Sequence, residues 1–333
     1  MKSASNDSQT LSALEEIFKK GGSFFLLGHE DPDGDCIGSL AGLYHLLKEK
    51  NKDVEILLFD DVPPRFELAT GGIDNDLRII SEVESLSRRD GVVVLDSSSI
   101  DRVEPAQKAI ENMVKEEQQV VNIDHHEDNS HFGTINYVIP DAAATGEILL
   151  DMARSWSWQI NEPGARALAL AMLADTGFFR YSNTDRAVLE KMLFLLDYEV
   201  DLYSISRKLY GNKKPRKLKL LGRALSGLRI LHGNKIASLI ISKDDYRLTG
   251  TSPVDRDNIV NYARDIEGVE VGLLFSEEEE GIKVSFRSND YVDVNKIAAE
   301  FGGGGHSRAA GCRINSDIDT AVDEVLEEVK KRV

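Results

Sequence analysis

Cysteine is nearly absent from the sequence, which contains only Cys36 and Cys312 among its 333 residues. Two thiols in separate glycine-containing motifs exclude a disulfide framework as the source of stability and fit a reducing compartment. Long apolar runs are also absent, because none approaches the roughly 20 residues of a transmembrane span. The N-terminal segment has no apolar core of signal-peptide length. We therefore expect a cytoplasmic protein with no part in a membrane.

Basic residues are few for the length of the chain. Lys and Arg total 40 against 57 Asp and Glu, which gives a formal net charge of −17. A field of this sign repels polyanions and argues against binding long duplex nucleic acid through phosphate neutralisation. A small phosphorylated ligand remains compatible with this charge, because a local cluster of cations and metal ions can hold it.

Length and periodicity predict two domains, since 333 residues can bury two cores. Up to about residue 185, short aliphatic runs alternate with helical periods, which is typical of a parallel sheet covered by helices on both faces. The strands that we expect there are 24–27, 54–59, 92–95 and 120–123, and the helices are 11–19, 37–50, 106–117, 146–155 and 164–174.

The rest of the chain predicts a linker and a smaller domain. Residues 186–232 continue with helical periods and contain Gly and Pro breakers, so we expect a helical linker. Strand-like alternation follows at 235–242, 269–275 and 281–287, with the acidic residues 277–280 as the turn of a hairpin. The predicted fold class is α/β, with a parallel-sheet domain over 1–185 sandwiched by helices and a smaller α+β domain over 233–333.

Side chains that bind metals follow the predicted strands of the first domain. The four groups are His29 with Asp33 and Asp35, then Asp96, then Asp124-His125-His126, and finally Asp175 at the end of a predicted helix. In open α/β sheets, ligands bind outside the carboxyl ends of the strands. We therefore expect these groups to converge at one edge of the sheet.

Each group alone has an ordinary explanation. Asp35 or Ser39 could cap the helix expected from Ile37, and adjacent histidines are common on protein surfaces. Together, however, five carboxylates and three imidazoles would repel and desolvate one another unless cations neutralised them. A mixture of imidazole and carboxylate ligands is suited to a divalent metal ion, so the sequence predicts a metal site.

These four groups and the glycine-rich run 301–311 resemble the motifs of the DHH phosphoesterase superfamily, in the branch where a DHHA1 domain follows. Order, spacing and length are most similar to the NrnA-like branch. Its members are nano-RNases and phosphodiesterases acting on short oligonucleotides such as pApA, some also on cyclic di-AMP or adenosine 3′,5′-bisphosphate. The resemblance covers nearly the whole chain and implies a DHH catalytic domain over 1–185 and a DHHA1 substrate-binding domain over 233–333.

The resemblance also implies two divalent ions, commonly manganese, and hydrolysis by a water that they activate. Carried onto this sequence, one ion would be held by His29, Asp33 and Asp96, and the other by Asp35, Asp96, His125 and Asp175. Mixed imidazole and carboxylate ligation suits Mn²⁺ better than it suits Mg²⁺, which prefers oxygen alone. The catalytic roles would fall to Asp96, which bridges the ions, and to His126 as proton donor, with Asp124 orienting an imidazole.

Substrate contacts are expected mainly on the second domain. Arg287 resembles the substrate-gripping arginine of the family, and its planar fork suits a terminal phosphate. The glycine run could be a flexible turn, or its backbone amides could approach an anion, helped by a helix beginning at Ser307. The full set of expected contacts is Arg287, Ser288, Gly303, Gly304, Gly305, His306 and Arg308, with Arg102 from the first domain. A cleft between the two domains would favour a dinucleotide or short oligonucleotide.

We therefore expect a Mn²⁺-dependent phosphodiesterase that hydrolyses short oligonucleotides to mononucleotides. The same metals would serve an adenosine 3′,5′-bisphosphate phosphatase or a DHH-type inorganic pyrophosphatase, although the glycine run counts against the latter. A nucleotide-sensing binding module with a dead metal site is an alternative of another class, and the complete ligand set weighs against it. The sequence leaves open the ranking of substrates, the polarity of cleavage and the oligomeric state, including a homodimer.

Overall fold

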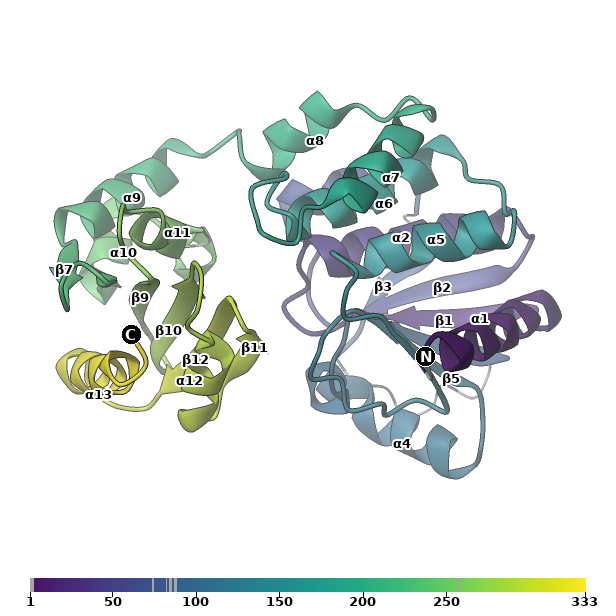
Figure 1. The fold of residues 1–333 in the computed structure, drawn as a ribbon, viewed down its shortest axis with the longest axis horizontal. Coiled ribbons are helices and arrows are strands. Elements are labelled where there is room, and N and C mark those ends of the chain that lie inside the picture. The colour runs from purple at the N-terminus through teal and green to yellow at the C-terminus, as the bar shows by residue number, and fades with distance from the viewer. Residues whose placement is uncertain (1–2, 74, 82, 84–85, 87–88, 257) are drawn as a thin grey trace. The chain divides into compact units, whose positions relative to one another are not determined.

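The structure of the protein is a computed structural model that describes residues 3–73, 75–81, 83, 86, 89–256 and 258–333 (Figure 1). The chain forms two compact units, residues 1–212 and 213–333. Each unit has a sheet and its own hydrophobic core. The segment 186–232, expected as a linker, is divided between them at residue 212.

A parallel sheet forms the centre of the first unit. Its strands are β1 (Ser23–Leu27), β2 (Asp53–Leu58), β3 (Leu77–Ile79), β4 (Gly91–Leu95), β5 (Val120–Asp124) and β6 (Ile135–Val138). They lie in the order β3-β2-β1-β4-β5-β6, and the pairings are parallel. The four predicted strands are present. The direction in which the strand order grows reverses between β1 and β4, which is where α/β sheets of this kind bind ligands.

Helices cover both faces of this sheet, as predicted (Figure 1). The hydrophobic core on one face of the sheet contains residues from α1 (Ser3–Lys20), α2 (Gly34–Lys48), η1 (Pro64–Phe66), α3 (Glu67–Thr70), α5 (Thr145–Ser155), α6 (Glu162–Asp175), α7 (Arg186–Leu196) and α8 (Leu202–Leu209). The other face packs against η2 (Ile100–Ala106) and α4 (Gln107–Lys115). Helices α2 and α6 approach closely, because a Cβ atom at Gly38 would lie 2.6 Å from the carbonyl oxygen of Ala167.

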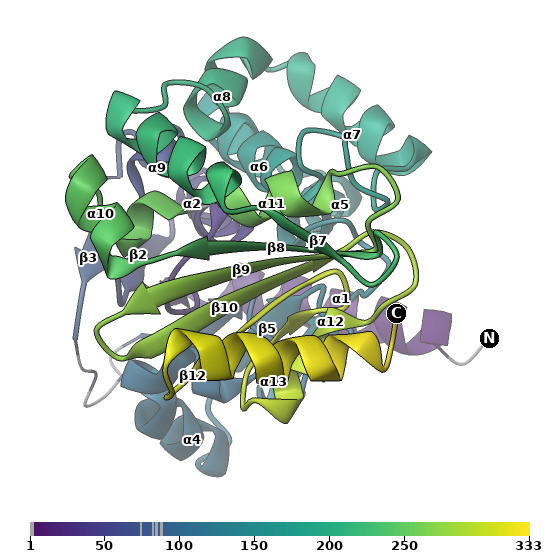
Figure 2. The same cartoon turned by 90° about the vertical axis from the view of Figure 1, so that its left-hand side faces the viewer.

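The second unit contains a mixed sheet (Figure 2). Its strands are β7 (Arg229–Leu231), β8 (Ile236–Ile241), β9 (Val271–Glu278), β10 (Gly281–Ser288), β11 (Gly304–His306) and β12 (Ala309–Ile314), in the order β11-β12-β10-β9-β8-β7. The pair β8 and β9 is parallel, and the other pairs are antiparallel. The hairpin predicted at the acidic residues 277–280 is formed by β9 and β10.

Two groups of helices cover the second sheet. The helices α9 (Pro215–Ser226), α10 (Lys243–Thr249), η3 (Pro253–Arg256) and α11 (Ile259–Arg264) lie in sequence before β9, and three of them contribute to a core with β8 and β9. On the other core, α12 (Val294–Glu300) and α13 (Ile318–Lys330) pack against β9, β10 and β12. Among the described helices, none has the length and apolar character needed to cross a membrane.

The glycine-rich run differs from the sequence-based expectation of a helix beginning at Ser307. No helix begins at Ser307, because Ser307 and Arg308 form the turn between β11 and β12. Gly303 packs against the neighbouring strand so closely that a Cβ atom there would lie 2.2 Å from the carbonyl oxygen of Gly311. The run therefore continues as a strand, and its amides are not backed by a helix dipole.

Candidate metal centre

Asp33 determines how the first motif folds. It follows β1 in an extended conformation and is the N-cap of α2, where its Oδ1 accepts hydrogen bonds from the backbone amides of Asp35 at 3.0 Å and Cys36 at 3.1 Å. The alternative that Asp35 or Ser39 caps this helix is therefore wrong. Asp35 lies instead in the first turn, fully buried, and accepts a 2.8 Å hydrogen bond from the Ser39 hydroxyl.

Asp96 lies between two groups of ligand atoms at the end of β4. Its Oδ2 is 3.7 Å from Nε2 of His29, and its Oδ1 is 3.6 Å from Nε2 of His125. The residue adopts the left-handed conformation with φ of 55°, and its amide donates to the carbonyl of Ile123 on β5. A non-glycine residue in this conformation is uncommon, and such strain occurs most often at functional sites.

The two histidines predicted as ligands, His29 and His125, have their rings fixed by backbone carbonyls. Nδ1 of His29 donates to the carbonyl oxygen of Glu30 at 2.6 Å, and Nδ1 of His125 donates to that of Ala142 at 3.1 Å. Because a carbonyl can only accept, each neutral ring carries its proton on Nδ1 and directs the lone pair of Nε2 toward the carboxylates. Metal-binding histidines are commonly oriented by such a contact.

The carboxylates around His125 come from three elements. Its Nε2 is 3.7 Å from Oδ2 of Asp35, 3.6 Å from Oδ1 of Asp96 and 3.3 Å from Oδ2 of Asp175. On the other side, Nε2 of His29 is 3.9 Å from Oδ1 of Asp33. The six side chains predicted as ligands are thus brought together in the first unit, one group around His29 and the other around His125, which is the division that the resemblance implies.

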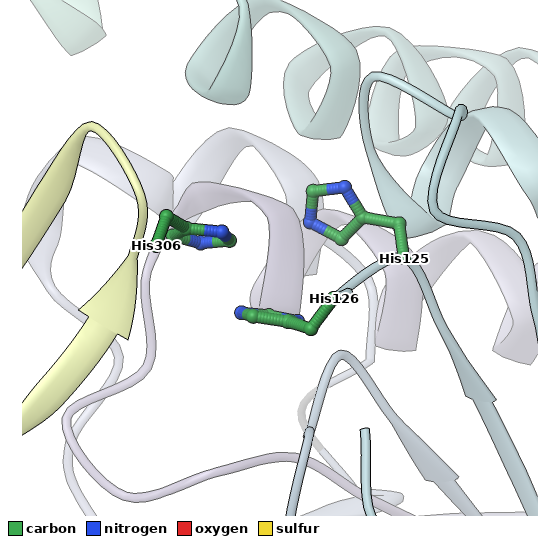
Figure 3. A group of neighbouring side chains, drawn as sticks. All are labelled: His125, His126 and His306. Carbon is green, nitrogen blue, oxygen red and sulfur yellow. The ribbon is translucent and has the colours of Figure 1, made fainter. Parts of the chain in front are cut away.

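His125 and His126 both follow β5, but their rings lie in different planes (Figure 3) and make different contacts. Nδ1 of His126 is 2.7 Å from Oδ1 of Asp124, whose Oδ2 accepts a 2.7 Å hydrogen bond from Asn129. The same amide group of Asn129 lies 2.8 Å from Oδ1 of Asn122. This support was not predicted, because an asparagine five residues after Asp124 carries no recognisable ligand pattern in the sequence.

The concentration of charge shifts the ionisation of the buried groups. Burial, with the neighbouring carboxylates, raises the pKa of Asp35 well above its ordinary value, and burial and the charge of Asp33 raise that of Asp175 to about 6. Burial also acts to raise the pKa of Asp96, but the nearby imidazoles of His29, His126 and His125 outweigh it and lower the pKa. Burial lowers the pKa of His125, but the contacts with Asp175, Asp35 and Asp96 outweigh it and raise the pKa.

These residues fit a divalent cation by the chemistry and spacing of their donors. Separations of 3.3–3.9 Å between Nε2 and carboxylate oxygens are longer than ordinary hydrogen bonds. Two donors that are each about 2.1 Å from one ion lie roughly 3.0–4.2 Å apart, depending on the angle between them at the ion. Asp35, Asp96 and His125 form one buried cluster of this kind. The sulfur of Cys36 lies near His29 and Asp96, but burial raises its thiol pKa and so disfavours the thiolate that a metal needs.

Arg102 is the predicted phosphate contact in the first unit. It is exposed, its carbonyl oxygen accepts from the amide of Glu30, and a terminal guanidinium nitrogen lies 3.1 Å from Nδ1 of His29. Since that ring nitrogen donates to Glu30, the guanidinium is a neighbour of the ring and not its hydrogen-bond donor.

In the second unit, strand register brings two predicted substrate contacts onto one face. Ala309 pairs with both His306 on β11 and Arg287 on β10, so the three residues form a row across the sheet. Ser288 points to the opposite face and is buried, and a guanidinium nitrogen of Arg308 donates to the carbonyl of Val292 at 2.9 Å. Arg287 and His306 therefore remain the better placed of the predicted contacts.

Comparison with known proteins defines the class. Residues 23–175 match the DHH family, N-terminal domain, and residues 236–333 match the DHHA1 domain. The chain belongs to the DHH–DHHA1 phosphoesterases of the NrnA-like type, enzymes that hydrolyse phosphoric esters, as the sequence predicted.

Particular relatives extend over the whole chain. The bifunctional oligoribonuclease and PAP phosphatase NrnA of Thermus thermophilus is 33% identical, over 98% of this chain and 95% of the relative. The cyclic-di-AMP phosphodiesterase GdpP of Bacillus subtilis is 23% identical over 96% of this chain, which spans 49% of that relative. The crystal structure of an exopolyphosphatase-related protein from Bacteroides fragilis covers 97% of both chains, with a TM-score of 0.88 and 25% identity.

Proposed function

We propose that the protein is a metal-dependent phosphodiesterase that hydrolyses short oligonucleotides such as pApA to mononucleotides. The observation that carries this proposal is the position of Asp96, whose two carboxylate oxygens face two different imidazole and carboxylate groups. A single carboxylate shared in this way suits a pair of cations, and paired cations are typical of enzymes that displace oxygen at phosphorus.

In this proposal, His29, Asp33 and Asp96 hold one divalent ion, and Asp35, Asp96, His125 and Asp175 hold the other. Mn²⁺ is the preferred ion because both groups mix imidazole with carboxylate. The chemistry supplied by such a pair is activation of water and neutralisation of charge at phosphorus. The protein itself contributes ligands whose positions are fixed by hydrogen bonds before substrate binds.

Proton transfer is assigned to His126. Its contact with Asp124 fixes the ring and stabilises the protonated form, because the carboxylate lies 2.7 Å from Nδ1. The Nε2–H group of that form is the proposed proton donor to the leaving oxygen. Arg102, Arg287, His306 and the amides of Gly304 and Gly305 are proposed as phosphate contacts, since guanidinium groups and backbone amides are good donors to phosphate oxygens.

Two substrates besides oligonucleotides are supported by specific relatives. The full-length similarity to an enzyme named oligoribonuclease and PAP phosphatase favours adenosine 3′,5′-bisphosphate as a second substrate. The weaker similarity to a cyclic-di-AMP phosphodiesterase, of which this chain spans 49%, makes cyclic di-AMP the less favoured one.

The test is a comparison of substrates with defined metal content. Protein freed of metal by a chelator is reloaded with Mn²⁺, with Mg²⁺ or with neither. Each form is given pApA, an RNA of about 20 nucleotides, adenosine 3′,5′-bisphosphate and cyclic di-AMP, and products are separated by chromatography. We expect Mn²⁺ to restore hydrolysis most fully, with pApA cleaved fastest. Hydrolysis that survives complete metal removal, or pApA cleaved no faster than the long RNA, would contradict the proposal.

A further inference from the structure

The segment from Ala142 to Gly146, which follows β6 and includes the first two residues of α5, contacts several of the proposed ligands. The carbonyl of Ala142 accepts from His125, and the hydroxyl of Thr145 donates to Oδ1 of Asp96 at 3.3 Å. The amides of Thr145 and Gly146 donate to the two oxygens of Asp35 at 2.6 and 3.0 Å. Backbone atoms of this short segment and the hydroxyl of Thr145 therefore touch three side chains that the proposed function assigns to metal binding.

These contacts also start helix α5. Its N-cap is Ala144, which has no side-chain oxygen to accept a hydrogen bond from the first turn. Asp35 of α2 supplies that acceptor from outside the helix. The carboxylate of Asp35 therefore caps α5, and the same hydrogen bonds fix its position as a proposed metal ligand. Any movement of the start of α5 would therefore move or release Asp35.

The buried carboxylate of Glu147, which is paired with Lys191, fixes the position of this segment. Oε2 of Glu147 accepts from the amide of Ala143 at 2.6 Å, while its Oε1 pairs with Lys191 of α7. Glu147 is only 4% exposed, and the side chain of Lys191 is 13% exposed. Lys191 also pairs with Asp151 at 2.6 Å, a side chain that is 52% exposed.

Asn183 makes a second connection. Its amide group donates at 3.1 Å both to the carbonyl of Ala143 and to that of Asp175. The segment is thereby tied to the end of α6, which carries a further proposed ligand. Asn183 itself is exposed, so this connection does not depend on core packing.

We propose that Glu147, Lys191 and Asn183 are positioning residues that fix the 142–146 segment and so set the affinity of the centre for divalent cations. This inference rests on the proposed metal-dependent function. None of the three side chains belongs to the proposed ligand set. Glu147 and Asn183 would act on metal affinity through their hydrogen bonds to the backbone of Ala143 and Asp175, and Lys191 through its pairing with Glu147. The proposed ligands affected would be Asp35, Asp96, His125 and Asp175.

The test measures metal binding in the full-length protein. Glu147→Gln keeps the size of the side chain but leaves only one acceptor oxygen. The amide of Ala143 and the ammonium group of Lys191 each need one. We expect the Kd for Mn²⁺, measured by the electron paramagnetic resonance of free Mn²⁺, to rise about tenfold. Amide hydrogen exchange of residues 143–146 should become faster in the same variant, because the amide of Ala143 loses its fixed acceptor.

Two further variants separate positioning from general stability. Asp151→Asn removes the other partner of Lys191 without touching the segment, so its Kd should stay at the wild-type value. Asn183→Ala changes an exposed side chain, should fold normally, and should also raise the Kd. Wild-type Kd values in both Glu147→Gln and Asn183→Ala would overturn the inference, and if Glu147→Gln does not fold, the Kd of Asn183→Ala decides. A wild-type protein that binds no divalent cation would instead overturn the proposed function.

Discussion

At the scale of single residues, Asp96 is constrained by both its backbone and its chemistry. The left-handed conformation with φ of 55° is tolerated best by Gly, Asn and Asp, and of these only Asp supplies a negative charge. Its carboxylate oxygens face His29 and His125 separately. The residue is therefore the one whose charge matters to both halves of the proposed centre.

Replacement of Asp96 by Asn removes that charge while keeping the shape and the tolerated backbone. Metal ions contribute several kcal/mol of transition-state stabilisation, and about 1.4 kcal/mol is a factor of ten in rate. We expect kcat/KM for pApA to fall by at least roughly 100-fold and the bound Mn²⁺, measured by atomic absorption, to fall for both sites. Asp101→Asn, at an exposed position on η2, is the matched control. Full metal content in Asp96→Asn would show that Asp96 does not bridge.

His45 is a buried histidine away from the centre. Its Nε2 has no hydrogen-bond partner within the part of the chain that the structure describes, and burial, with the charge of Arg166, lowers its pKa to about 4. In the unfolded chain the pKa of His45 has its ordinary value of 6.5, so as pH falls the unfolded chain binds a proton before the folded protein does. The contribution of this neutral ring to stability is thus complete above pH 6.5 and is lost between pH 6.5 and 4.

His45→Leu should remove that pH dependence. Relative to the variant, the wild type should lose about 1 kcal/mol of unfolding free energy between pH 7.5 and 5.5, as measured by urea titration at both values. An equal pH dependence in the two proteins would show that His45 is protonated or solvated in the folded state.

The side chains that meet at the candidate metal centre were predictable from the sequence, whereas the residues that support them were not. His29, Asp35 and Asp175 follow apolar strands or a helix, so their residue types and positions predict a shared edge. Asn129 and Glu147 lack such a signal, because their partners are atoms such as the amide of Ala143 whose proximity depends on the folded backbone. Sequence patterns report which elements form, but not which backbone atom a side chain reaches.

At the scale of elements, the hairpin of β11 and β12 gives the glycine run a packing role. Gly303 and Gly304 are adjacent in sequence but differ in their surroundings. A Cβ atom at Gly303 would lie 2.2 Å from the carbonyl oxygen of Gly311, whereas at Gly304 its nearest neighbour would be Oδ1 of Asn295 at 3.7 Å. Neither position has the positive φ that only glycine adopts easily.

This difference predicts that Gly303→Ala and Gly304→Ala, which each add one methyl group, change stability by unequal amounts. Gly303→Ala should destabilise the second unit by about 1–3 kcal/mol, because the added atom forces backbone apart in a packed region. Gly304→Ala should change stability by less than about 0.5 kcal/mol, while it can still affect phosphate binding. Thermal denaturation of the two variants measures the difference, and similar melting temperatures would contradict the close approach at Gly303.

Elements with weak sequence patterns were missed for a physical reason. Strands β3 and β6 lie at the edges of the first sheet, and their residues are half-buried or exposed, so neither shows an apolar run. In β11, two of the three residues are glycines, so the sequence lacks the alternation of apolar and polar side chains that indicates a strand. The central strands β1, β4 and β5 are buried on both faces and were predicted within a residue of their ends.

At the scale of the whole molecule, the net charge of −17 acts on every phosphate that does not reach a cation. A dinucleotide places its few phosphates at the site, while a long strand leaves many exposed to the acidic surface. Salt screens such interactions, with a Debye length of about 10 Å at 0.1 M. Repulsion of long strands should therefore weaken as ionic strength rises.

The ratio of kcat/KM for pApA to that for an RNA of about 20 nucleotides should accordingly fall as salt is raised from about 0.05 to about 0.3 M. We expect a decrease of about twofold or more, measured with Mn²⁺ held constant. A ratio that is high and independent of salt would assign the preference for short substrates to the shape of the binding site instead of to charge.

The two separate cores have a consequence for how this enzyme can diversify. The proposed metal ligands lie between residues 29 and 175 in the first unit, while Arg287 and His306 belong to the second, which is stabilised by its own core. If Arg287 and His306 contact the substrate as proposed, substitutions around β10 and β11 can alter which phosphorylated molecule is held without disturbing the packing that places the proposed metal ligands. One hydrolytic centre can thus be kept unchanged while substrate preference drifts, and relatives with different substrates can arise from the same chemistry.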